Sequence, residues 1–294
     1  MTSPVQVLDD VALVAPLGLR FWDVATMAPA EAGLAVTASP ASYPDLIFTA
    51  ATGPGGAYSF SALPGARRFE EGGDDDAFWA ANPAGTVYTI NVADPQGRYL
   101  PFRLSLLVPF RGFYELPASP PATGLSPDPT WLPVFSTPSR VLPGPGAVVR
   151  AQLRDESSGG GAMWAMVTAQ FSGLPPMSGV ADERGVVSLS VAYPEPANSP
   201  FGSLPASGLV KLSDQSWPIG IAVHYSGLLA ARSTPDLEEL LQQGAATAWS
   251  DTAHSAPANS FTVGFGSDLV LRSRDSVSGR ELPVLLVTGA GSPI

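Results

Sequence analysis

Two histidines are the residues of this chain best suited to acid–base or metal chemistry. His224 and His254 lack a spacing such as H-E-x-x-H, which would bring two imidazoles to one zinc ion. The local signatures of serine acylation, G-x-S-x-G and S-x-x-K, are also missing from the sequence. Local motifs do not test for a catalytic triad whose members are far apart in sequence. A lone histidine on a strand, however, usually has a structural role. We therefore expect no enzyme activity and assign no catalytic residue.

An acidic run offers the only obvious cluster of oxygen ligands. It comprises Glu70, Glu71 and Asp74–Asp76, and clustered carboxylates can bind Ca²⁺. The run lacks the alternating ligand spacing of an EF-hand loop, and blocks of like charge usually remain solvated. The glycines at 53–56 and 264–266 lack the spacing of a phosphate-binding loop. We predict a surface loop at 70–76, and neither a metal nor a cofactor.

Charge and composition exclude several kinds of partner. The 294 residues carry a net charge of −11, and Lys211 is the single lysine. Nucleic acid and anionic membrane surfaces both require a basic face, so we expect neither as a partner.

There is no cysteine, hence no disulfide and no thiolate ligand. No apolar run approaches the ~20 residues that span a bilayer. The N-terminus lacks the basic start of a secretory signal, so we expect synthesis and assembly in the cytoplasm.

The elements that would position any site are short strands. Proline and glycine number 31 and 30, which favours many turns. Two stretches share a pattern, Val92–Val108 and Val180–Pro194. Each begins Val-Ala-Asp, has a glycine three residues after the aspartate, and continues with apolar residues at alternate positions. This repeat predicts two β-domains in tandem.

Further alternating stretches complete the predicted strands, and one stretch predicts a helix. At 234–243, Thr234 is the expected cap, Pro235 the first helical residue, and Gly244 the stop. The predicted strands are Leu17–Ala25, Gly33–Ala38, Leu46–Ala51, Val87–Val92, Tyr99–Val108, a stretch around Val149–Leu153, Met163–Phe171, Val187–Val191, Trp217–Tyr225, and a joined pair at Phe261–Arg272 and Leu282–Thr288.

A proline-rich segment separates the two sets of strands. Residues 115–146 contain nine prolines, and proline cannot donate to a central sheet. The same segment carries Trp131, Leu132, Val134 and Phe135, too apolar for a free linker. We predict an arm that packs on its own domains or on a neighbouring subunit, and we assign these four residues to protein interaction.

A decapeptide near the N-terminus indicates the type of fold. Gly56–Gly65, GAYSFSALPG, resembles the G-x-Y-x-F-x-x-L-P-G pattern of transthyretin-like (Cna-B) β-sandwich domains. The predicted fold is all-β, with two tandem Ig/transthyretin-like sandwiches at 1–114 and 147–294, a Pro-rich arm at 115–146, and one short helix near 234–243. Some Cna-B domains carry a Lys–Asn crosslink, which a chain with Lys211 alone is not expected to form.

A second resemblance covers most of the chain. The stretches LRFWDVAT, ADPQGRYLPFRLSL, GVADERGVVSLSVAYP, WPIGIAVHY and PDLEELLQQ look like an accessory protein family of contractile, phage-tail-like injection systems. The resemblance implies a structural subunit in a ring or other multi-copy assembly, with cap, sheath or tube subunits as partners and release on lysis. A cap adaptor is the first interpretation, and a baseplate accessory protein the second.

An adhesion or carbohydrate-binding module is the competing interpretation. A β-sandwich supports it equally, because fold does not fix function. Its sugar-stacking residues would come from the six tryptophans, which on alternating strands also serve as core or interface residues.

Overall fold

The chain is mostly β-structure arranged in several sheets. A computed structural model describes residues 15–30, 32–70, 76–82, 85–117, 125–142, 146–195 and 214–289. Strands dominate these residues, and the helices are short. The all-β prediction is therefore confirmed for the described part of the chain. Lys211 and most of the acidic run lie outside it.

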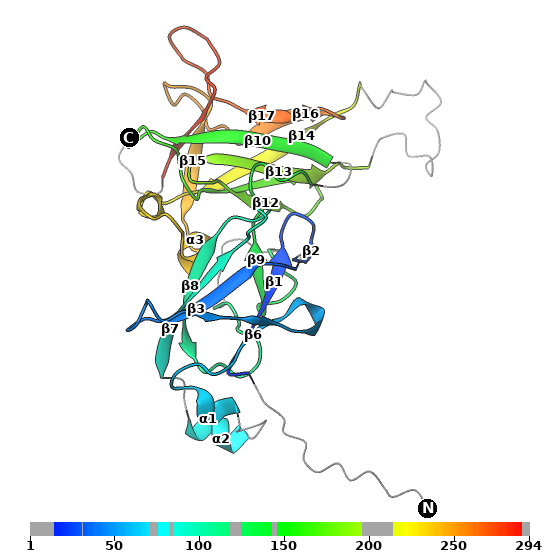
Figure 1. Ribbon diagram of the computed structural model, residues 1–294. Helices are drawn as coiled ribbons and strands as arrows, with labels where there is room; N and C mark the ends of the chain where they lie inside the picture. The colour runs from blue at the N-terminus through cyan, green and yellow to red at the C-terminus, as the bar shows by residue number, and fades with distance from the viewer. Residues whose placement is uncertain are drawn as a thin grey trace, which may run out of the picture.

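Two sheets built from the N-terminal half face each other (Figure 1). One has the order β2-β1-β6-β5, with β9 also paired to β1, and the other has the order β4-β3-β7-β8. The first contains β1 (Leu17–Asp23), β2 (Ala28–Pro29), β5 (Ala51–Thr52), β6 (Tyr58–Phe60) and β9 (Trp131–Val134). The second contains β3 (Ala35–Pro40), β4 (Phe48–Thr49), β7 (Thr86–Ala93) and β8 (Phe102–Val108).

The period-2 pattern of these strands places one apolar face of each sheet in a shared core. Phe21 of β1 reaches Tyr58 and Phe102 with ring centroids 5.3 and 6.3 Å apart. The expected single strand at 46–51 is instead divided: β4 joins one sheet and β5 the other. The chain crosses between the layers there, and this crossing helps to enclose the core.

The C-terminal half forms one nine-stranded sheet that curls. Its order is β12-β11-β14-β15-β18-β10-β13, with β16 beside β14 and β17 beside β10. Gly179 of β12 lies against Val187 and Leu189 of β13, so the two ends of the sheet meet over a second apolar core. The strands are β10 (Gly146–Asp155), β11 (Met166–Phe171), β12 (Met177–Val180), β13 (Val186–Ala192), β14 (Ser216–His224), β15 (Ala245–Trp249), β16 (Ser260–Gly264), β17 (Leu269–Leu271) and β18 (Leu285–Thr288).

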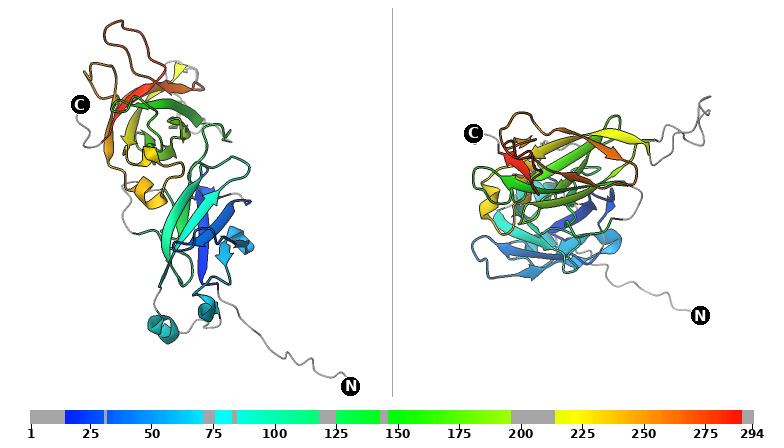
Figure 2. Two further views of the ribbon diagram at one scale, coloured as in Figure 1. Left: turned by 60° about the vertical axis from the view of Figure 1, so that its left-hand side comes forward. Right: turned by 90° about the horizontal axis from the view of Figure 1, so that it is seen from above.

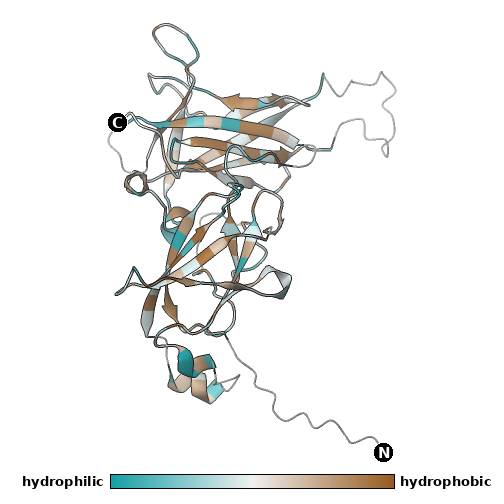
Figure 3. Ribbon diagram, in the orientation of Figure 1, coloured by the Kyte–Doolittle hydropathy of each residue, from teal (hydrophilic) through white to brown (hydrophobic). Residues whose placement is uncertain are grey.

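The predicted C-terminal strand pair meets only beside its turn, where Arg274 and Glu281 form an antiparallel bridge and Ser273 exchanges backbone hydrogen bonds with Leu282 and Val284. β17 and β18 do not pair with each other as named strands; both pair in parallel with β10, at Val149–Ala151 and Leu153–Asp155. Residues 272–284 connect them by a loop at the top of Figure 1. Pairing with β10 leaves β18 buried along its whole length, whereas in β17 Leu271 is buried and Val270 stays 45% exposed. The alternation of apolar and polar bands along β10 and its neighbours is visible in Figure 3.

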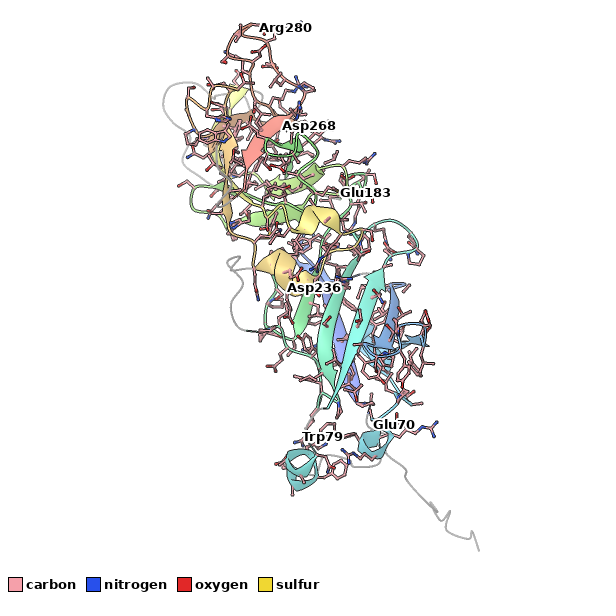
Figure 4. All side chains as sticks on the ribbon, turned by 90° about the vertical axis from the view of Figure 1, so that its left-hand side faces the viewer. Glu70, Trp79, Glu183, Asp236, Asp268 and Arg280 are labelled. Atoms are coloured by element: carbon pink, nitrogen blue, oxygen red, sulfur yellow. The ribbon has the colours of Figure 1, made fainter. Side chains whose placement is uncertain are left out.

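The two halves share a junction built around helix α3 (Leu237–Leu241). Leu237, Leu240 and Leu241 belong to the N-terminal core, together with Trp164 from the C-terminal half. The side-chain amide of Gln243 donates to the Trp164 carbonyl oxygen at 2.9 Å, and the Tyr114 hydroxyl donates to Glu238 at 2.7 Å. Figure 2 shows α3 between the two halves, and Figure 4 labels Asp236 at its start.

Helix α3 begins later than the sequence predicts. Asp236, not Thr234, is the N-cap, and its carboxylate accepts from the backbone N–H of Glu238 at 3.1 Å. Pro235 lies outside the helix because its carbonyl accepts the Arg103 amide of β8 at 2.9 Å. The prediction of a single helix is also incomplete: α1 (Arg67–Glu70) and α2 (Asp76–Ala81) flank the acidic run. Glu70 and Trp79 mark them in Figure 4.

The repeated Val-Ala-Asp stretches form the same turn twice. Asp94 and Asp182 each accept backbone N–H groups two and four residues ahead. Gly97 and Gly185 have φ of 68° and 78°, a left-handed conformation that glycine adopts without strain. An arginine pairs with each carboxylate, Arg98 at 2.8 Å in the first turn and Arg184 at 2.8 Å in the second. Both turns line a cleft of about 340 Å³ between the halves.

The first turn predicts a specific pH dependence. Burial alone would raise the pKa of Asp94, but the Arg98 side chain and two backbone N–H groups outweigh it and hold that pKa below its usual value. Because the folded pKa is depressed, the stabilisation is complete above about pH 4, the unfolded pKa, and is lost as pH falls through the folded pKa. Asp94→Asn should be less stable than wild type at pH 7, by about 1–3 kcal/mol.

The measurement is urea unfolding of both proteins from pH 7 to pH 3. The stability difference between wild type and Asp94→Asn should shrink below about pH 4. Asp45→Asn, an exposed position, serves as the matched control and should follow wild type throughout. A difference that stays constant down to pH 3 would contradict the role given to the charged carboxylate.

Candidate protein-interaction site

The four residues predicted for protein interaction divide into two groups. Leu132, Val134 and Phe135 are buried in the N-terminal core, with exposed fractions of 0%, 0% and 4%. Trp131 is half-buried at the surface. The part of the arm in β9 thus packs on the chain's own sheet. Contact of these residues with another protein stays a prediction. Of the four, Trp131 is the one whose side chain is partly exposed.

Strand β9 positions Trp131 through parallel pairing with β1. Arg20 pairs with Trp131, Phe21 with Leu132, and so on to Asp23 and Val134. β9 pairs with β1 alone among the described strands, so it is an edge strand, where the missing N–H of Pro133 is tolerated. The alternation along both strands places Leu132 inward, and Arg20, Trp22 and Trp131 on the outer side.

The outward side chains form a continuous stack. The guanidinium carbon of Arg20 lies 4.2 Å from the ring centroid of Phe113 and 4.6 Å from that of Trp131. Trp131 contacts Trp22 edge to face at 5.6 Å between centroids. We call Phe113, Arg20, Trp131 and Trp22 the aromatic–arginine stack. Phe113 also packs on Gly18. A Cβ at that position would approach the Phe113 ring to 3.2 Å, so a larger residue would crowd the ring.

Arg20 is held in place by its neighbours. It donates to the Thr130 hydroxyl, and its guanidinium lies 3.9 Å from Asp128. Hydrogen bonds from Thr130, together with the charge of Arg20, hold the pKa of Asp128 below its usual value. Asp128 therefore stays ionised at neutral pH and keeps a negative charge beside the guanidinium. The Arg20 plane is fixed between two rings rather than free in solvent.

A buried ion pair supports the stack from the inner side. Arg140, beyond β9, places a guanidinium nitrogen 2.8 Å from the carboxylate of Asp23 at the end of β1. The Tyr99 hydroxyl donates to the same carboxylate at 3.1 Å, and its ring lies 4.6 Å below the guanidinium. Asp23 also accepts the Ala25 amide at 3.0 Å. The carboxylate is paired on every side, as a buried charge requires.

The composition of the stack suits protein recognition. Tryptophan and arginine are the residues most enriched at binding hot spots, and a preordered side chain loses little entropy on binding. A guanidinium between aromatic faces gains cation–π stabilisation of about 0.5–2 kcal/mol per contact. The stack can therefore give a partner a rigid aromatic surface, whose central guanidinium is paired with Asp128.

The two histidines lie outside the aromatic–arginine stack. His224 places Nδ1 3.3 Å from the Gln243 carbonyl oxygen, while His254 stacks on Trp249 at 4.6 Å and pairs with Glu156. Within the described ranges, no three His, Cys, Asp or Glu side chains gather as a metal site. Nor does any helix of the described chain have the length and apolar character needed to cross a membrane.

Sequence reasoning missed most of the stack. Arg20 and Trp22 alternate with buried residues in LGLRFWD, a pattern that places them together on one face. Phe113 gives no such signal, because its position depends on a bridge between Gly18 and Phe113, far apart in sequence.

Comparisons with known proteins do not identify a family. No protein-family model matches this chain, and no curated protein matches it either.

The stack and the core beneath it should respond differently to truncation. Leu132→Ala removes a fully buried side chain and should lower the free energy of unfolding by about 2–5 kcal/mol. Trp131→Ala, at the neighbouring but partly exposed position, should cost clearly less, about 1–2 kcal/mol. Urea unfolding followed by circular dichroism measures both. If the two losses are equal, the stack is part of the core and is not a surface available for binding.

Proposed function

We propose that this protein is a non-enzymatic structural subunit that holds neighbouring proteins in place. Its most specific form is a cap adaptor of a contractile, phage-tail-like particle, present in several copies and bound to cap, sheath or tube subunits. The aromatic–arginine stack carries the proposal, because it offers a preordered surface made of hot-spot residues. The type of particle in this proposal comes from the sequence resemblance to accessory proteins of such particles.

The junction between the halves supports a positioning role. Helix α3 and Trp164 contribute to a core made mainly by the other half of the chain, so the halves are packed together rather than tethered. A subunit that sets the spacing of its neighbours needs such a body, because a flexible linker would let the contact surfaces drift apart. We include in the proposal the assignment of both halves to Ig/transthyretin-like β-domains.

A position in the baseplate remains the second form of the proposal. The same stack would serve there, so the choice depends on which end of a particle contains the subunit. Labelling of the subunit in intact particles answers this directly.

A carbohydrate-binding role has one observation in its favour. Tyr193, Trp217 and Phe265 cluster at one end of the curled sheet, with Tyr193 centroids 5.5 and 5.0 Å from the other two rings. All three are half-buried, and partly exposed rings can stack on sugars. The Tyr193 hydroxyl accepts the Gly266 amide at 2.9 Å, a contact that also suits a purely structural plug.

Co-purification with sheath and tube proteins tests the proposal. The tagged wild-type chain, expressed with the genes that neighbour its own, should co-sediment with particles, and Trp131→Ala should reduce its occupancy at least about tenfold, the loss of a hot spot worth about 1.4 kcal/mol or more. Trp217→Ala, at the other aromatic cluster, is the matched control and should leave occupancy unchanged. A chain absent from particles that binds a glycan array through Trp217 would replace the structural proposal with the carbohydrate-binding one.

A further inference from the structure

Large apolar side chains are exposed at one corner of the N-terminal half. Tyr43, Leu46 and Ile47, in the loop between β3 and β4, have exposed fractions of 69%, 46% and 64%. Nearby, Val87 and Leu107 are cross-strand partners, exposed at 45% and 51%. We call Tyr43, Leu46 and Ile47 the apolar knob; their loop projects beyond the strands of the sheet (Figure 1). Such a concentration usually marks a contact surface.

The knob is ordered before it meets any partner. The Ala41 amide donates to the Val87 carbonyl oxygen at 2.9 Å, which ties the loop to β7. Within the loop, Tyr43 donates to Pro40 at 2.9 Å and Leu46 donates to Tyr43 at 3.1 Å. Docking of the knob therefore requires little further ordering of the backbone.

A shallow groove in the other half of the same chain has complementary properties. It has a volume of about 450 Å³ and lies on the outward side of β11 and β14. Its floor is low because Gly220 and Ala222 carry little or no side chain; they pair across the strands with Gln170 and Thr168. The groove and the knob belong to different sheets, in different halves of the chain.

The distribution of charge bears on which molecule meets these two surfaces. The groove lining contains no charged residue, and neither do the three knob side chains, although the exposed Asp45 lies between Tyr43 and Leu46 in the same loop. In a chain with a net charge of −11, copies repel one another except where uncharged surfaces meet. Depletion of charge is also the compositional mark of interface cores. An anionic bilayer does not fit, because the segment 40–49 has no basic residue to attract it.

We propose that the apolar knob of one copy docks in the β11–β14 groove of the next copy. Different surfaces meet in this contact, so it is heterologous and builds a ring or a filament. The inference specifies how copies meet in the multi-copy assembly proposed above and rests on that part of the proposal. Because purified protein suffices to test it, its failure is distinguishable from failure of the particle assignment.

The absence of cysteine makes disulfide trapping selective. Ile47→Cys protein is mixed with Ala222→Cys protein under mild oxidation, and disulfide-linked peptides are counted by mass spectrometry. Val277→Cys, at an even more exposed position (94%) on another loop, replaces Ile47→Cys in the control. We expect at least about tenfold more 47–222 than 277–222 linkage, which corresponds to about 1.4 kcal/mol of preference.

Equal linkage in the two mixtures would overturn the proposal, as would a predominance of 47–47 linkage, which would mean an isologous contact between knobs. Sedimentation gives a second readout without cysteine. Association of the wild-type chain should strengthen at high salt, because salt screens the repulsion between copies. Ile47→Ser should abolish association, while Val277→Ser should not. A wild-type chain that is monomeric at every salt concentration would equally overturn the proposal.

Discussion

The buried contact between Asp23 and Arg140 is the constraint on which the proposed interaction surface depends. It joins the end of β1 to the segment after β9, across 117 positions of sequence. A carboxylate that is 1% exposed would be costly without a counter-charge. Arg140 supplies that charge, and Tyr99 and the Ala25 amide occupy the remaining lone pairs. The pair therefore holds the segment after β9 against the end of β1, next to the strand pairing that places Trp131 beside Arg20 and Trp22.

The junction at α3 likewise depends on a buried residue whose polar groups are hydrogen-bonded to distant parts of the chain. Trp164 is buried and adopts φ of +62°, a conformation that is rare for a bulky side chain. Its indole N–H donates to the Arg232 carbonyl oxygen at 3.0 Å, and Gln243 holds its backbone carbonyl. These contacts fix the backbone of a residue that packs into the opposite half. The two cores are thereby linked, and surfaces on distant sheets keep a defined relation.

Local patterns in the sequence were sufficient for much of this architecture. The alternation at Val87–Val92 and Val187–Val191 predicts β7 and β13 closely, and the Val-Ala-Asp stretches predict their turns because the aspartate and glycine act within five residues. Contacts that join distant positions could not be predicted in this way. The pairing of β9 with β1, the position of Phe113, and the pairing of β17 and β18 with β10 depend on which strands the folded chain brings together. The helix cap is Asp236 and not the predicted Thr234 for the same reason, because an amide of β8 donates to the Pro235 carbonyl oxygen.

Hydrogen exchange in an Arg140→Ala variant tests the central claim most directly. If the Asp23–Arg140 pair holds the arm, the Leu132 and Val134 amides of β9 should lose protection in the variant. The amides of β10 and β13, in the other core, should keep theirs. We predict this local loss together with retention of the native fold. Unchanged protection at β9, or an equal loss at β9 and β10, would contradict the account.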